Sequence, residues 1–239
     1  MRLGWWLGNP GVAGADTYRL GEPRLLLRPL WSEAFGLTDD QSPYIYLSDG
    51  GHLENMGLYE MVLRRCRFIV VSDAGADPDY QFEDLGNAVR KIRIDQGIPI
   101  EFETLPIHRR SGPDDQSGRY CAIGRIRYST VDGENAPDGV LICFKPVLCG
   151  KETRDVQHYA AKNAEFPQEP TSNQFYGESQ FESYRQLGEI AVETAFGDEP
   201  LPLSEKSWAA GVVDAARKHL GNQGGKSYWI DAWLAGLRP

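Results

Sequence analysis

The stretch that decides the fold runs from residue 44 to residue 75 and reads YIYLSDGGHLENMGLYEMVLRRCRFIVVSDAG. Residues 44–47 and 68–71 are short runs of apolar and aromatic side chains, which is typical of strands. Each run is followed by a Ser-Asp turn sequence. Between them, residues 58–66 carry apolar side chains at helical spacing. The stretch therefore predicts a strand, a helix and a second strand, with a tight turn of positive φ after the first strand.

The alternation continues beyond residue 75. Residues 82–92 carry the apolar stripe of a second helix, which Gly97 ends, and residues 98–102 resume an extended pattern. Strands that alternate with helices favour a parallel sheet covered by helices. Right-handed crossovers would then place both Ser-Asp turns at the same edge of that sheet, where ligand sites of α/β folds lie.

The remaining segments complete the predicted architecture. Residues 120–128 and 140–148 are β-rich, and no helical pattern separates them, so they predict an antiparallel hairpin. The first forty residues predict an irregular entry segment. After residue 150 the pattern is mainly helical, and Ser204 is a candidate N-cap of the last long helix. We expect an α/β fold with a mixed, mainly parallel sheet flanked by helices, in a portion spanning residues 1–150 and a helical extension spanning residues 151–239.

Composition excludes several classes of protein. The 239 residues carry 34 acidic and 25 basic side chains, a net charge of −9, which opposes nucleic-acid binding. No apolar run approaches the roughly 18 residues of a spanning helix. The four cysteines form no C-x-x-C pair, which favours reduced thiols and a cytoplasmic location. The four histidines lack metal-ligand spacing, so a zinc site built by the protein is not predicted.

The candidate chemistry lies at Asp49. An acidic residue that follows a strand and precedes two glycines holds its carboxylate at the edge of a sheet, open to a reacting group. Spacing alone favours a simpler role, in which Asp49 starts the turn by accepting hydrogen bonds from backbone amides. His52 beside it is more typical of a polar cap than of an acid or a ligand.

Residues 46–60, YLSDGGHLENMGLYE, closely resemble the second half of patatin-like and cytosolic phospholipases, whose hallmark is an Asp-Gly-Gly box followed by an Asn and a helix. The likeness covers most of the chain from about Trp5 to Arg185. It continues at residues 64–66 (RRC), 69–74 (IVVSDA), 82–87 (FEDLGN), 166–167 (FP), 174–175 (QF) and 180–185 (QFESYR).

This resemblance implies the carboxyl-terminal part of the patatin α/β/α fold and hydrolysis of a carboxylic ester of a lipid, of the phospholipase or lysophospholipase type. In that family a serine attacks the ester and an aspartate takes its proton directly. Asp49 matches the aspartate, Gly50 and Gly51 match the turn that aims it, and Asn55 would support the loop, with a helix N-cap as its simpler role. No cofactor is implied, and the expected ligand is a lipid or ester.

The sequence departs from the family at the nucleophile. The family's serine lies in a G-x-S-x-G elbow, and the chain has none: Ser179 and Ser227 both lack the second glycine. The chain therefore resembles the C-terminal half of such an enzyme. It should be nearly inactive alone and should need an N-terminal half that carries the nucleophile, which is also where membrane association would reside.

Three interpretations follow. The chain is a fragment or separately encoded half of an acyl hydrolase; it is a lipid-binding or interaction module that kept the fold without the chemistry; or it is an ordinary α/β module in which Asp49 only shapes a turn. Under the third, Asp49 would be buried away from every cleft or bonded only within its own loop. A sheet that lacks neighbouring strands would expose an edge, which predicts self-association or pairing with a partner.

Overall fold

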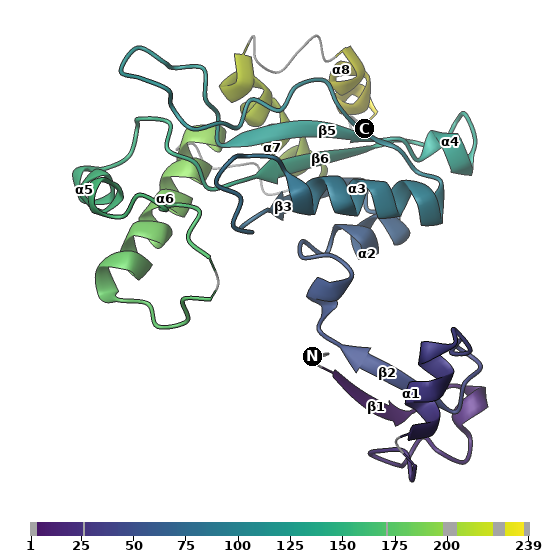
Figure 1. The fold of residues 1–239 in the computed structure, drawn as a ribbon. Helices are drawn as coiled ribbons and strands as arrows, with labels where there is room; N and C mark the ends of the chain where they lie inside the picture. Colours follow the sequence, from purple (N-terminus) through teal and green to yellow (C-terminus); the bar gives the residue numbers. More distant parts are fainter. Residues whose placement is uncertain (1–3, 26, 171, 198–204, 222–227, 237–239) are drawn as a thin grey trace. The chain divides into compact units, whose positions relative to one another are not determined.

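The computed structural model describes residues 4–25, 27–170, 172–197, 205–221 and 228–236 (Figure 1). The chain divides into two compact units, Met1–Leu53 and Glu54–Pro239, and each is described by itself. This division falls at residue 53, whereas the sequence suggested one at residue 150. The helices that follow residue 150 share a hydrophobic core with strands that precede it, which joins both segments in the second unit.

The first unit is built on two antiparallel strands. β1 (Gly4–Gly8) pairs with β2 (Tyr44–Ser48) along its whole length. Between these strands lie a short 3-10 turn, η1 (Val12–Gly14), and the helix α1 (Leu27–Ala34), and after them comes η2 (Gly50–His52). The prediction of an irregular entry segment was wrong, because β1 is formed by pairing with a strand far along the chain, which leaves no local signal.

A buried asparagine organises the loops of the first unit. The Asn9 side chain donates to the backbone oxygens of Asp40 and Ser42 at 2.9 and 2.8 Å, and its oxygen accepts from the amide of Gly11. A buried side-chain amide without hydrogen-bond partners would destabilise the fold. The three bonds satisfy Asn9 and hold its loop against residues 40–42.

The second unit contains a four-stranded sheet in the order β3-β6-β5-β4. β3 (Phe68–Ser72) runs parallel to β6 (Gly139–Phe144), whereas β5 (Cys121–Ile126) runs antiparallel to both β6 and β4 (Ile100–Phe102). The predicted α/β class, the mixed sheet and the β5-β6 hairpin are confirmed. The expectation of a mainly parallel sheet was wrong, since only β3 and β6 are parallel among the described strands.

The position of β2 is a second correction. β2 pairs with β1 in a separate sheet, so the two Ser-Asp turns do not lie at one sheet edge. The strand-helix-strand pattern of residues 44–71 is present, but the helix α2 (Leu58–Leu63) does not connect two strands of one sheet. A crossover argument holds only when both strands join the same sheet.

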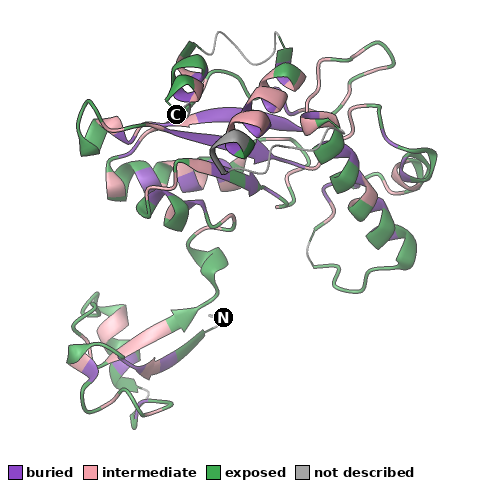
Figure 2. Cartoon of the chain, turned by 180° about the vertical axis from the view of Figure 1, so that it is seen from behind, coloured by how far each residue is buried: buried purple, intermediate pink, exposed green. Residues whose placement is uncertain are grey.

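Helices cover both faces of the sheet in the second unit (Figures 1 and 2). α2 and α3 (Glu83–Gln96) bury Leu58, Val62, Leu85 and Ile92 against one face. α6 (Glu178–Phe196), α7 (Glu205–Leu220) and α8 (Tyr228–Ala235) pack on the other face, and α5 (Arg154–Lys162) lies against α6. A single turn of helix, α4 (Ser129–Asp132), lies between β5 and β6. The proposed cap Ser204 lies outside the described residues.

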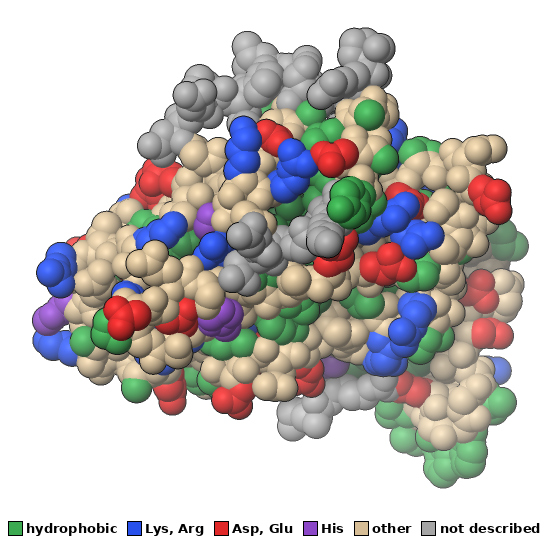
Figure 3. Space-filling view, turned by 90° about the horizontal axis from the view of Figure 1, so that it is seen from above, with side chains coloured by type: hydrophobic (Ala, Val, Ile, Leu, Met, Phe, Trp, Pro, Cys, Tyr) green, Lys and Arg blue, Asp and Glu red, His purple; other side chains and the backbone are tan. Residues whose placement is uncertain are grey.

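The charges on the surface and the polarity of the helices are those expected from the composition of the chain. On the face seen from above, Lys and Arg side chains lie among Asp and Glu side chains and do not form one continuous basic surface (Figure 3). Among the described helices, none combines the length and the apolar character that crossing a membrane requires.

Candidate functional site

Asp49 directly follows β2 and begins η2. Its Oδ1 accepts a hydrogen bond of 2.9 Å from the amide of Gly51, and its Oδ2 bonds to no described residue. The side chain is exposed. This bond lies within the residue's own loop, as the third interpretation of the sequence expects, and it leaves one carboxylate oxygen free to accept a proton.

The two glycines act differently from the prediction. Gly50 and Gly51 form a right-handed 3-10 turn, and neither has the positive φ expected from the sequence. A Cβ at Gly50 would meet no atom within 4 Å. The turn therefore does not need glycine at residue 50 for its backbone conformation, although the missing side chain leaves the space beside Asp49 open.

His52 closes the same turn. Its Nδ1 lies 3.1 Å from the backbone oxygen of Asp49 and 3.0 Å from Oγ of Ser48. A carbonyl oxygen only accepts, so this geometry favours the tautomer in which Nδ1 carries the hydrogen. In that tautomer Nδ1 has no lone pair with which to take a proton from Ser48. The pair is therefore a cap of the turn and not a serine-histidine nucleophile.

Asn55 belongs to the second unit, and its side chain makes a different contact from the two expected. It donates a hydrogen bond of 3.0 Å to Oδ1 of Asp84 on α3. It does not cap α2, whose N-cap is Gly57. Glu54 fills the capping role instead, because its carboxylate accepts from the amides of Met56 and Tyr59 at 2.8 and 3.3 Å. Glu54 lies four residues before the first residue of α2. An acid close to the start of a helix was the sequence signal that could have indicated this cap.

Three of the four cysteines and the two serines compared with an elbow give no nucleophile among the described side chains. Burial raises the pKa of Cys121, Cys143 and Cys149 to about 12, so these thiols remain protonated at neutral pH. Ser179 is exposed in the first turn of α6, and the residues around it do not form a G-x-S-x-G elbow. Ser227 lies outside the described residues.

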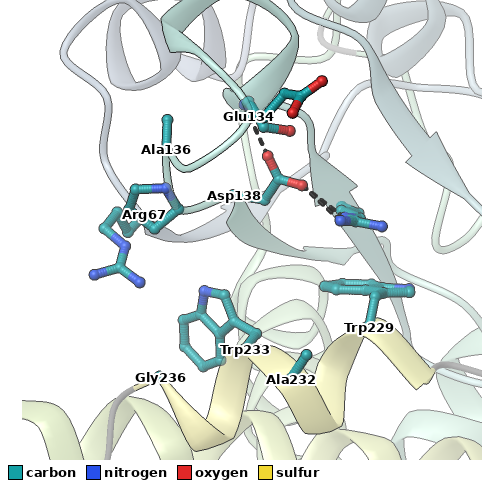
Figure 4. A pocket seen from close by; sticks show the side chains of 11 residues that line it. Arg67, Glu134, Ala136, Asp138, Trp229, Ala232, Trp233 and Gly236 are labelled. Carbon is teal, nitrogen blue, oxygen red and sulfur yellow. Dashed lines mark hydrogen bonds and ion pairs between the residues drawn. The ribbon is translucent and has the colours of Figure 1, made fainter.

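Asp49 lines none of four cavities that the described residues form. One cavity of about 530 Å³ lies within the first unit beside Pro29, and one of about 380 Å³ lies between the end of β3 and α6. The third, of about 250 Å³, lies where Trp229 and Trp233 of α8 face the loop before β6 (Figure 4). The fourth, of about 370 Å³, is lined by basic side chains.

The charged side chains of the cavity in Figure 4 are engaged in structural interactions. Asp138 pairs with Arg125 at 2.8 Å and accepts from the amide of Ser129 at 2.9 Å. The guanidinium of Arg125 also lies over the ring of Trp229, 5.8 Å from its centre. These contacts engage the carboxylate of Asp138 and hold the β5-β6 hairpin against α8. The charged residues of this cavity therefore have a structural role.

Sequence reasoning missed a buried ion pair at the end of β3. Nζ of Lys145 lies 3.0 Å from Asp73 and 3.6 Å from Asp77. The side chains of Lys145 and Asp73 are 1% and 0% exposed. A lysine inside the apolar run of residues 140–148 was the signal that could have indicated a buried partner.

Comparison with known proteins identifies no relative: no family model, no curated protein and no solved structure matches the chain.

Proposed function

We propose that this chain contributes the acid-base carboxylate of a patatin-like lipid acyl hydrolase, with Asp49 accepting the proton of a serine that another polypeptide segment supplies. The observation that carries the proposal is the free Oδ2 of Asp49, held at the exit of a strand by the single bond from Gly51 to Oδ1. The resemblance of residues 46–60 to the Asp-Gly-Gly box supplies the class of reaction.

The proposed chemistry is a two-step ester hydrolysis. The serine oxygen attacks the ester carbonyl while its proton passes to Oδ2 of Asp49, and the proton then goes to the leaving alcohol. Water hydrolyses the acyl-serine, again with Asp49 as the base. An exposed aspartate is a weak base, so the segment that brings the serine must also remove water from the carboxylate and thereby raise its affinity for the proton.

The test combines the chain with the polypeptide encoded directly upstream of its gene and measures hydrolysis of a p-nitrophenyl acyl ester and of phosphatidylcholine. We expect hydrolysis only when both polypeptides are present. The variant Asp49→Asn keeps an oxygen that can accept from Gly51, so the turn is retained and only the base is removed. Its kcat/KM should fall by about 10²-fold or more.

Asp39→Asn is the matched control. Asp39 is an exposed aspartate of the same unit whose Oδ1 accepts from the amide of Gln41 at 3.1 Å, so the substitution makes the same chemical change in a similar turn. Hydrolysis should be unchanged in this variant. Equal activity of Asp49→Asn and the unmodified chain, or no hydrolysis by the mixture, would refute the proposed role and leave Asp49 as a turn residue.

A further inference from the structure

The fourth cavity is notable for its charge. It has a volume of about 370 Å³, and its lining includes Arg110, Arg119, Lys151 and His219 but no acidic side chain. The whole chain carries a net charge of −9, so a cavity lined only by basic and neutral side chains is a local reversal of sign. Such a reversal concentrates anions in a cleft.

The basic groups lack anionic partners among the described residues. Neither the guanidinium of Arg110 nor the ammonium of Lys151 lies within 4.0 Å of a described carboxylate. Arg119 uses Nε and one terminal nitrogen to bond backbone oxygens, including that of His219 at 2.9 Å. Its other terminal nitrogen makes no bond to a described residue, so it retains donors for a ligand.

Two buried nitrogen atoms of the same cavity also lack partners. Nε of Arg110 and Nε2 of His219 are inaccessible to solvent and make no hydrogen bond with a described residue. An unsatisfied buried polar atom is destabilising, and the side chains of both residues line the cavity. The Arg110 guanidinium lies directly over Gly150, whose φ of +85° favours glycine at this residue.

A buried acid close to the lining residues is already engaged by hydrogen bonds. Glu152 is buried beneath it, and its carboxylate accepts from the amides of Cys149 and Gly150 at 2.6 and 2.9 Å and from the hydroxyl of Tyr120 at 3.0 Å. Because no carboxylate lines the cavity, the charged groups at its wall are all basic.

We propose that this cavity binds a phosphomonoester or inorganic phosphate dianion. Two guanidinium groups and one ammonium group match the charge and the tetrahedral oxygens of phosphate better than the single negative charge of a carboxylate. The site is independent of Asp49 and of the proposed ester hydrolysis. The phosphate can belong to a soluble compound or to a lipid headgroup, and the experiment separates these two sources.

The test titrates the full chain with inorganic phosphate at pH 7 and constant ionic strength, using calorimetry, with chloride as the reference anion. We expect saturable binding that Arg110→Gln and Lys151→Gln each weaken by about tenfold, the loss typical of one charge-assisted hydrogen bond. Arg109→Gln is the matched control, because it removes the same charge from the adjacent exposed residue, which does not line the cavity. Its affinity should change less than twofold.

A spectroscopic readout separates binding at this cavity from a general charge effect. Burial and the nearby Arg119 and Lys151 lower the pKa of His219 to about 4. Bound phosphate should raise that pKa, as followed by NMR of the imidazole, and the rise should need about tenfold more phosphate in Lys151→Gln. Because Lys151 is exposed, this variant folds even if Arg110→Gln does not.

The second arm uses vesicles of phosphatidylcholine with one fifth phosphatidic acid, compared with vesicles carrying the same charge as phosphatidylserine. Binding to phosphatidic acid that requires Arg110 and Lys151 identifies a lipid headgroup as the source. Binding of inorganic phosphate alone identifies a soluble compound. An affinity for phosphate no higher than the affinity for chloride would overturn the proposal. Equal phosphate affinities of Lys151→Gln and the unmodified chain would also overturn it.

Discussion

Lys145 and Asp73 form an ion pair of 3.0 Å in which both side chains are almost completely buried, at the ends of the two parallel strands β6 and β3. The lysine also donates to the backbone oxygen of Gly75 at 3.2 Å, and Asp73 accepts from the amide of the same glycine. The pair therefore ties the turn after β3 to the neighbouring strand. Removing one partner leaves a buried charge unpaired.

We expect Lys145→Met to lower the free energy of unfolding of the second unit by about 3–5 kcal/mol, measured by urea denaturation. The double variant Lys145→Met with Asp73→Asn should recover part of this loss, because it removes the unpaired charge. Lys162→Met, on the exposed surface of α5, should change stability by less than about 0.5 kcal/mol. A loss for Lys145→Met as small as this control would contradict the structural role of the pair.

Gly14 tests the packing of the first unit. A Cβ at this position would collide with the backbone of Asn9, the residue whose side chain holds the loops of the unit. Since the obstructing atoms belong to the backbone, Gly14→Ala should destabilise the first unit by about 1–3 kcal/mol or more. Limited proteolysis should show faster cleavage within residues 1–53 and unchanged cleavage within the second unit.

Gly21→Ala is the control for that substitution, because a Cβ there would meet no atom within 4 Å. Its cleavage pattern should equal that of the unmodified chain. Equal protection of the Gly14→Ala and Gly21→Ala variants would show that the turn at η1 can move away from Asn9, against the tight packing described above.

The pH dependence of stability should contain a contribution from His219. Its folded pKa of about 4 lies below the ordinary value of 6.5, so between these values the unfolded chain binds a proton that the folded chain excludes. Stability should therefore fall as pH falls from about 6.5 to about 4. The ring is only half-buried, so solvent screening reduces the expected contribution to about 1 kcal/mol.

Urea unfolding of the unmodified chain and of His219→Gln across this pH range isolates the contribution. The charged or titratable groups around the ring are Arg110, Arg119, Tyr120, Cys149, Lys151 and Glu152, and on its own helix Arg217 and Lys218. His158→Gln, on the exposed surface of α5, should leave the pH profile unchanged. Parallel profiles for His219→Gln and the unmodified chain would refute the assignment.

Local features of the fold were predictable from the sequence because their signals lie within one segment. α3 and α6 repeat an apolar stripe over several turns, and the hairpin of β5 and β6 joins two adjacent apolar runs. The pairing of β1 with β2 has no such signal, because the two strands are distant in the chain. For the same reason, the sequence placed β2 in the wrong sheet.

The candidate sites show the same limit. The bond from Gly51 to Asp49 was predictable because aspartate commonly accepts from the amide two residues later. The bond from Asn55 to Asp84 was not, because it requires α3 to approach the start of α2. The basic cavity was also not predictable, since its lining residues come from separate segments that only the folded second unit brings together.

The exposed edge of β3 bears on the expected self-association. The backbone oxygen of Arg67 and the backbone amide of Asp73 form hydrogen bonds with β6. Backbone groups of a strand alternate in direction, so those of Phe68, Val70 and Ser72 point away from β6. These groups form no backbone hydrogen bond with another described residue, and the side chain of Val70 is 45% exposed. An unpaired apolar strand edge is a template for pairing with a second copy of the chain.

We expect the mass measured by light scattering to rise with concentration, and Val70→Lys to shift the chain toward the monomer because a charge on an edge strand opposes pairing. Ile94→Lys makes the same change at an exposed residue of α3, away from the strand edge, and should leave association unchanged. Since both variants gain one positive charge, a difference between them reports on the strand edge and not on net charge. A monomer at all concentrations, or equal association of both variants, would exclude pairing through β3.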